Sequence, residues 1–186
     1  ALAKSLTKSK HEERIVATDL DAERLSEIKK LGVATTNSNK EAAGKAEIII
    51  LCVKPKDVEK ALKEIRNETN GKIVISFAAA LQLSVLKKAS PQAHFVRAMP
   101  NIAVLVQESF TAYCVDPDVT LEDKRKAEAI LSKLGRFVEM EEKDMDAITG
   151  LSGCAPAYLS MVLEALTYAG LEAGLSKDVA LLAAAQ

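Results

Sequence analysis

Residues 149–158 have the sequence TGLSGCAPAY and contain the side chains best suited to chemistry on a bound ligand. Ser152 supplies a hydroxyl and Cys154 a thiol, and Gly153 between them allows a ligand or another chain to approach the backbone closely. Pro156 suits the first position of a helix, because its fixed φ is helical and its missing N–H is not needed there. The stretch predicts a tight turn that leads into a helix, whose N-terminus attracts negative charge.

Glu108 is the only charged residue of the mostly apolar segment 102–115. A carboxylate in apolar surroundings is costly unless a partner compensates its charge. Glu108 is therefore the acid most suggestive of a functional role, and the alternative is a charge in an exposed loop.

Short apolar segments alternate with amphipathic ones along the chain. This alternation predicts an α/β fold with a Rossmann-like, doubly wound and mostly parallel sheet. Strands are expected at residues 14–18, 33–35, 48–53, 72–77, 94–98, 110–115 and 136–140. Ligands of such sheets bind at the carboxyl ends of the strands. The candidate cofactor-binding residues at these ends are Thr18, Asp19, Cys52, Val53, Lys54, Pro55, Phe77, Ala78, Ala79 and Asn101.

The helix after Pro156 is apolar on nearly all sides, and Glu164 is its only charged residue before Leu171. Such a helix must be buried on most sides, which here requires a partner subunit. We therefore expect two domains, a dinucleotide-binding domain at residues 1–142 and the start of an all-helical dimerisation domain at residues 143–186.

A dinucleotide-binding sheet also needs a first strand and a glycine-rich turn that places phosphate at a helix N-terminus. None of the eight glycines gives that fingerprint, and residues 1–6 fit the far half of the helix that should follow it. The first strand usually lies in the middle of the sheet, so we expect a gap there with unpaired strand edges. We also expect the sequence to be truncated at both ends, since it stops at Gln186 within a helical run.

The composition excludes several classes of partner. The net charge of −1 gives no reason to expect nucleic acid. The longest apolar run, residues 48–53, is too short to span a membrane, and no signal segment opens the chain. The three cysteines are scattered, and His11 and His94 have no metal-ligand spacing, so we expect neither disulfides nor a metal. A cytoplasmic location follows.

Several short motifs occur along the chain in a fixed order: VKP at 53–55, AA at 78–79, RAMPN at 97–101, MDA at 145–147, GLSG at 150–153 and PAY at 156–158. In order and spacing they resemble the pyrroline-5-carboxylate reductase family, over essentially the whole chain. The resemblance implies an oxidoreductase that uses NADPH or NADH to reduce the cyclic imine 1-pyrroline-5-carboxylate to L-proline, the last step of proline biosynthesis. It also implies a Rossmann domain followed by a helical domain that interlocks with a second subunit in a homodimer or larger homo-oligomer.

The resemblance assigns roles to particular residues. Lys54 is expected to contact the cofactor, and Asn39 its ribose. Glu108 is expected beside the substrate ring, where it stabilises the protonated imine that accepts the hydride. Three residues are expected to face the nicotinamide and the substrate: Ser152, Gly153 and Cys154. Together with Glu108 they are the expected catalytic residues.

Asp19 bears on the choice of cofactor. Because the first strand of the fold is missing, residues 14–18 correspond to its second strand, which Asp19 closes. An acid at this position accepts hydrogen bonds from a ribose and repels a 2′-phosphate, so we predict a preference for NADH. The alternative is a turn residue, since Asp21 is expected to cap the next helix.

The chain departs from the family at a few positions. The family usually has Ser-Gly where this chain has Cys154 and Ala155, Gly where it has Ala80, and Thr-Pro where it has Ile102 and Ala103.

Three alternatives stay open. A related hydroxy-acid dehydrogenase would carry a catalytic Lys on the long helix, and residues 156–176 contain none. A non-catalytic dimeric nucleotide-binding protein would tolerate the change at Cys154. A thiol enzyme would use Cys154 as nucleophile, but neither histidine lies near it in sequence. Cys52 and Cys114 are interpreted as strand core residues.

Overall fold

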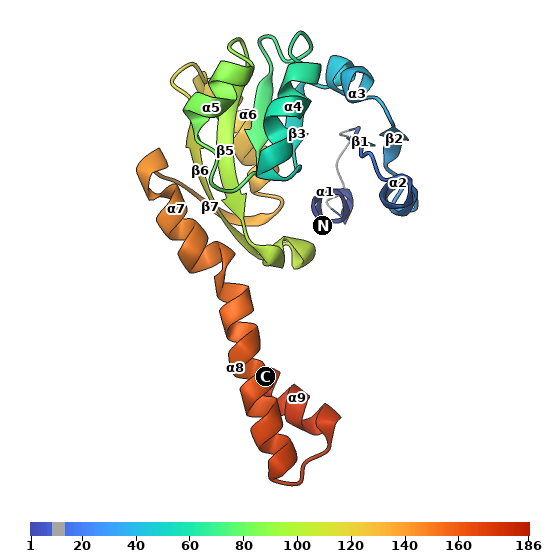
Figure 1. The fold of residues 1–186 in the computed structure, drawn as a ribbon, viewed down its shortest axis with the longest axis vertical. Coiled ribbons are helices and arrows are strands. Elements are labelled where there is room, and N and C mark those ends of the chain that lie inside the picture. The colour runs from blue at the N-terminus through green and yellow to red at the C-terminus, as the bar shows by residue number, and fades with distance from the viewer. Residues whose placement is uncertain (9–13) are drawn as a thin grey trace.

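The computed structural model describes residues 1–8 and 14–186, and its centre is a five-stranded sheet (Figure 1). His11 lies outside the described residues. The strand order is β3-β4-β5-β6-β7. Only the β5–β6 pair is antiparallel, so the predicted, mostly parallel sheet is confirmed. The strands are β3 Ile48–Leu51, β4 Ile73–Ser76, β5 His94–Pro100, β6 Ser109–Val115 and β7 Gly135–Glu139.

Two further strands, β1 (Val16–Thr18) and β2 (Ala34–Thr36), pair in parallel and form a separate sheet. β1 and β3 each lie at an edge of their own sheet, as expected for a sheet interrupted between these two strands. The helices α2 (Ala22–Lys29) and α3 (Asn39–Lys45) connect β1 and β2 to β3.

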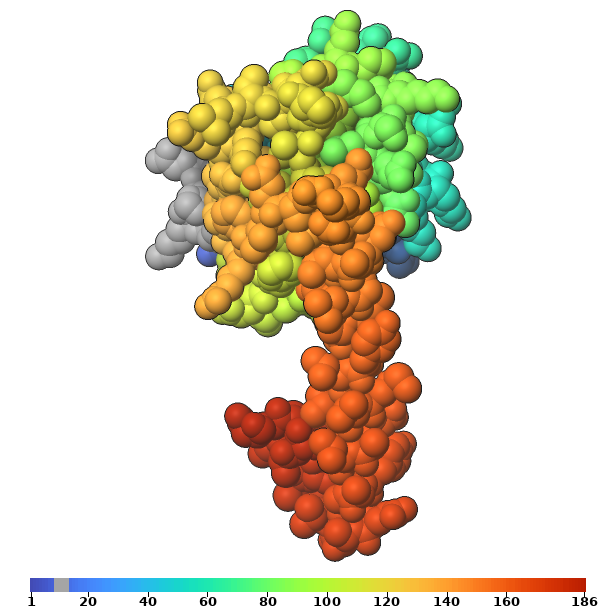
Figure 2. Space-filling view, turned by 90° about the vertical axis from the view of Figure 1, so that its left-hand side faces the viewer, coloured from blue at the N-terminus to red at the C-terminus, as the bar shows by residue number. Residues whose placement is uncertain are grey.

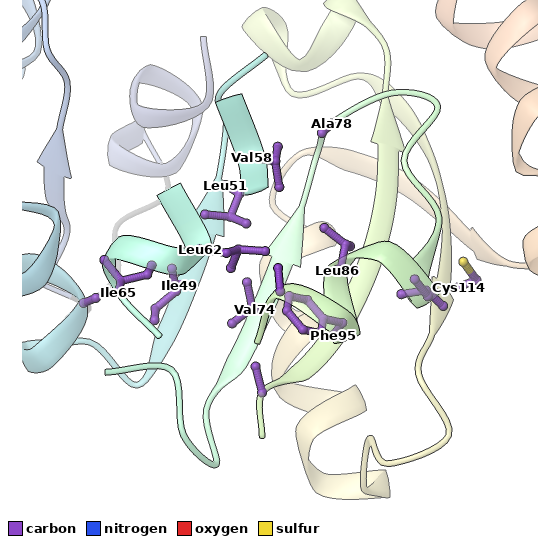
Figure 3. Packing of buried hydrophobic residues seen from close by; sticks show 14 of the residues in the cluster. Ile49, Leu51, Val58, Leu62, Ile65, Val74, Ala78, Leu86, Phe95 and Cys114 are labelled. Carbon is purple, nitrogen blue, oxygen red and sulfur yellow. The ribbon is translucent and has the colours of Figure 1, made fainter. Parts of the chain in front are cut away.

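Helices cover both faces of the larger sheet because successive strand residues point to opposite sides. Ile49 and Val74 pack with α4 (Pro55–Glu64) and α5 (Leu83–Ala89) on one face (Figure 3). Ile73, Ile75 and Val96 pack on the other face with α6 (Leu121–Leu131), and α1 (Leu2–Lys8) adds two partly buried leucines there. The result is a three-layer, Rossmann-like fold, in agreement with the predicted fold class.

Local sequence signals explain where several helices begin. The Asp21 side chain accepts hydrogen bonds from the first backbone N–H groups of α2, as predicted. Thr120 and Asp123 form the predicted capping box of α6. The end of α6 differs from the prediction: the helix ends at Leu131 rather than Leu134, and Gly135 begins β7 instead of closing the helix. Ser109 N–H donates to the carbonyl of Leu134 at 2.9 Å, which places this segment beside β6.

A helical arm follows β7 and projects away from the sheet (Figures 1 and 2). It contains the short helix η2 (Glu142–Asp144), α7 (Met145–Ile148), the π-helical turn η3 (Thr149–Gly153), α8 (Ala155–Glu172) and α9 (Lys177–Ala185). The predicted tight turn at residues 149–158 is therefore wrong in detail. The chain stays helical through this stretch and only widens to π geometry, so Pro156 takes the second position of α8. Within the described ranges, no helix is long and apolar enough to cross a bilayer.

We predict that Gly135→Ala destabilises the fold by about 3 kcal/mol or more. Gly135 has φ +137°, and a Cβ there would lie 2.2 Å from the carbonyl oxygen of Ser109 on the neighbouring strand. The measurement is urea unfolding followed by circular dichroism. Gly44→Ala is the matched control, because a Cβ on this helical residue meets nothing within 4 Å. It should raise stability by up to about 1 kcal/mol, and equal effects of the two substitutions would contradict the strain argument.

Candidate functional site

The last residues of β5 contact the turn η3 at the base of the helical arm. Asn101 Nδ2 donates a hydrogen bond to Ser152 Oγ at 3.2 Å. The Met99 methyl carbon lies 3.1 Å from where a Cβ of residue 153 would stand, so only glycine fits there without a shift of Met99. The structure thus brings two predicted catalytic residues, Ser152 and Gly153, to the carboxyl end of the sheet.

Glu108 lies in the turn before β6, next to the same group. Its neighbour Ser109 accepts a hydrogen bond from the backbone N–H of Asn101 at 3.1 Å. Because β6 runs antiparallel to β5, the start of β6 lies beside the end of β5. Glu108 itself is exposed, so the expectation that its carboxylate lies in apolar surroundings is wrong for this chain. The charge keeps its hydration and needs no buried partner.

Seven further strand-end candidates follow β3 and β4. Phe77 N–H donates to the carbonyl of Leu51 at 3.0 Å, so the segments that follow these two strands start side by side. Four of these candidates are exposed at the rim: Cys52, Val53, Lys54 and Pro55. Phe77 and Ala79 are partly buried, and Ala78 is buried.

The N-terminus of α4 opens at this edge. Lys54 occupies the N-cap position but its side chain makes no capping hydrogen bond, and Pro55 begins the helix. The first N–H groups of α4 therefore have no side-chain cap, and such a helix end favours anionic groups of a ligand.

Ala80 has φ +55°, in the left-handed region that favours glycine. This gives a physical reason for the glycine that the family usually has at this position. The alanine makes the turn after β4 more strained than glycine would.

A second group of candidates lies beside the smaller sheet, at the end of β1 and at the start of α3: Thr18, Asp19 and Asn39. Thr18 Oγ1 donates to Asn39 Oδ1, and Asn39 Nδ2 donates to Glu64 Oε2 at 3.0 Å. Asn39 thus links the smaller sheet to α4.

Asp19 takes part in the turn and also has a cation nearby. One of its oxygens accepts the backbone N–H of Asp21 at 3.0 Å, and the other lies 3.8 Å from the guanidinium of Arg24. Both interpretations of Asp19, as turn residue and as ribose contact, are compatible with this geometry. Sequence reasoning missed Arg24, although an Arg near this position is a known partner for a 2′-phosphate.

The three cysteines differ in environment. Cys114 is buried in the sheet, and burial raises the pKa of its thiol to about 11, so it is inert at neutral pH. Cys52 follows the end of β3 and is exposed as a residue, so it lies at the rim rather than within the strand. Partial burial of its thiol nevertheless raises the pKa to about 11. Cys154 is half-buried, and its hydrogen bond with Tyr158 holds the pKa of that phenol above its usual value. Among the described residues, no group of His, Cys, Asp and Glu could hold a metal ion.

The arm projects from the rest of the molecule (Figure 2), and many of its large apolar side chains are exposed. Met161 is 69% exposed although it lies in the middle of an 18-residue helix. Exposed apolar patches of this kind mark interaction sites. The large exposed apolar residues of α8 and α9 are Tyr158, Leu159, Met161, Val162, Leu166, Tyr168, Leu171, Val179, Leu181 and Leu182.

The sheet, the strand-end edge and the arm define a Rossmann-like α/β fold that is followed by a helical C-terminal region. Residues 1–80 match the family model for NADP oxidoreductase coenzyme F420-dependent, and residues 142–186 match the model for pyrroline-5-carboxylate reductase dimerisation. The chain is 37% identical over 169 residues to pyrroline-5-carboxylate reductase from Synechocystis. It is also 35% identical over 180 residues to pyrroline-5-carboxylate reductase 2 from Homo sapiens. The chain belongs to the pyrroline-5-carboxylate reductase family.

A solved structure agrees with this assignment. The crystal structure of the Plasmodium falciparum pyrroline carboxylate reductase with NADP bound has a TM-score of 0.91 and 29% sequence identity, and the match covers 100% of this chain and 70% of that one. The Synechocystis match covers 91% of this chain and 63% of that protein, and the human match covers 93% and 56%. The chain thus spans less than two thirds of the length of these two relatives.

Proposed function

We propose that the whole protein transfers a hydride from NADPH or NADH to the imine of 1-pyrroline-5-carboxylate and releases L-proline. Family membership supports this proposal, and the contact between Asn101 and Ser152 is the observation that carries it. That contact brings Ser152, at the base of the arm, to the end of β5, and ligands of doubly wound sheets bind at the carboxyl ends of the strands. A small substrate held between edge and arm would lie next to a cofactor on the edge.

The candidate residues fit a dinucleotide in position and chemistry. The open N-terminus of α4 suits a negatively charged group, and Thr18 and Asn39 provide hydrogen-bonding groups for a ribose. When bound, the nicotinamide supplies the hydride, and the protein orients the two reactants and stabilises charge. In this proposal Ser152, Gly153 and Cys154 face the substrate.

Glu108 would stabilise the protonated imine, since a carboxylate close to a cationic carbon–nitrogen bond lowers the energy of the species that accepts the hydride. Its position in the turn before β6, adjacent to Ser109 and Asn101, supports this role. A dehydrogenase that relies on a Lys of the long helix is not favoured, because α8 contains none.

The proposed activity is tested by mixing the whole protein with 1-pyrroline-5-carboxylate and either reduced cofactor and following absorbance at the nicotinamide band. We expect cofactor oxidation that depends on the imine. Glu108→Gln should lower kcat at least about tenfold while leaving cofactor affinity unchanged. Glu122→Gln on α6, an exposed partner of Lys126, is the control and should leave kcat as it is. Unchanged turnover in Glu108→Gln would remove Glu108 from the mechanism.

For the cofactor, we propose a preference for NADH, supported by the carboxylate of Asp19 at the end of β1. Asp19→Ser should raise the ratio of kcat/KM for NADPH to that for NADH at least about tenfold, because it removes a charge that repels the 2′-phosphate. Glu27→Gln on α2 is the control, since it removes an exposed charge from the same helix and leaves the ion pair between Asp21 and Arg24 in place. A wild-type protein that already prefers NADPH would refute the proposal.

We also propose that a second copy of the protein covers the apolar face of α8. Met161→Glu should convert the dimer or larger assembly to a smaller species in analytical ultracentrifugation, because it places a charge in an apolar interface. Arg125→Glu on α6 is the control: like Met161→Glu it introduces a glutamate, but at an exposed position outside the arm, and it should leave the assembly intact. Identical sedimentation of wild type and Met161→Glu would argue against this interface.

A further inference from the structure

Arg97 is a buried cation that joins the sheet to the base of the arm. Arg97 lies in the middle of β5, and its side chain is only 4% exposed although it is charged. Its guanidinium donates from Nη1 to Glu142 Oε1 at 3.2 Å and from Nη2 to Asp146 Oδ1 at 2.7 Å. Guanidinium remains charged when buried, and its planar fork can hold two carboxylates at once.

Three residues of β5 and its end point in the same direction, because alternate residues of a strand share a face. The first, Arg97, pairs with Asp146 of α7. The second, Met99, meets Gly153 of η3, and the third, Asn101, hydrogen-bonds Ser152. The strand therefore contacts the base of the arm at three successive points, of which the ion pair is the only one that involves charge.

The segment between these contacts is short and internally bonded. Met145, the first residue of α7, is fully buried in the core, and Thr149 Oγ1 donates to the carbonyl of Met145 at 2.7 Å. Glu142 Oε1 also accepts the backbone N–H of Leu83 at 2.6 Å, which ties the same carboxylate to the start of α5. A shift of α7 would thus be passed to the turn η3 and to Ser152.

We propose that Arg97 is a positioning residue, which holds α7 through Asp146 and Glu142 and so sets the position of Ser152 over the carboxyl edge of the sheet. Arg97 acts through α7 and does not touch the substrate. The catalytic part of this inference rests on the proposed function, because only a reaction at the edge gives the position of Ser152 a kinetic consequence.

The first test measures hydrogen–deuterium exchange in the whole protein. Asp146→Asn weakens one of the two ion pairs of Arg97. The Asp146 side chain is 74% exposed, so the fold should survive the change. We expect amide exchange in residues 145–154 to speed up by about three- to tenfold, while exchange in β4 and β5 stays unchanged. Asp144→Asn, an exposed neighbour on η2, is the matched control. Equal exchange in wild type and Asp146→Asn would overturn the proposal.

The second test separates positioning from a general loss of structure. Arg97→Met should lower kcat at least about tenfold, with kcat calculated per protein molecule that binds cofactor. KM for the cofactor should stay within about twofold of wild type, because the substitution leaves the strand ends of β3 and β4 unchanged. Arg97→Lys keeps the charge but cannot bridge two carboxylates, so it should recover part of kcat. Arg125→Lys on α6 is the control.

The outcomes distinguish the two proposals. If Arg97→Met is active at the wild-type rate and its exchange in residues 145–154 is unchanged, the positioning role is wrong. If the wild type reduces no imine but exchange in residues 145–154 responds to Asp146→Asn, the positioning of the turn is supported and the proposed function fails. If Arg97→Met does not fold, Asp146→Asn and Arg97→Lys decide the question.

Discussion

The contact between β5 and the base of the arm is the constraint on which the rest of the structure depends. One face of β5 carries a cation, a thioether and an amide at successive alternate positions, and each meets a residue between 146 and 153. The apolar residue Met145 fixes the same segment in the core. Because the base of α8 follows without a break, these contacts determine the direction in which the whole arm leaves the sheet.

The outer part of the arm, α8 and α9, buries little of its apolar surface in the part of the chain that the structure describes. α8 and α9 pack against each other, but α8 has no fully buried residue and α9 has one, Ala180. Most of their large apolar side chains face outward, at a cost that burial against another protein surface would remove. The small β1–β2 sheet differs from the arm: its residues are partly or fully exposed, and β1 has no strand partner in the larger sheet.

Predictions from the sequence succeeded where a structure depends on residues close together in the chain. The caps at Asp21 and Thr120, the helix α5 and the buried strands of the larger sheet all follow from patterns a few residues long. They failed where the environment decides. Glu108 lies among apolar residues in sequence but on the surface in space, and Cys52 continues an apolar run beyond the end of β3. The glycines near Ser152 indicated a turn, but the backbone remains helical there.

By itself, the sequence determined the order of helices and strands and the layered fold, and it indicated the sheet edge proposed here for ligands, since hydrophobic periodicity and helix capping are local properties. Arg97 was visible in the sequence only as part of a motif, and no local pattern connects it to Asp146, 49 residues away. Asn101 and Ser152, 51 residues apart, are likewise joined only by the fold. Tertiary structure alone decided these contacts, because they depend on which faces of two distant segments meet, and side-chain spacing along one segment carries no information about the other.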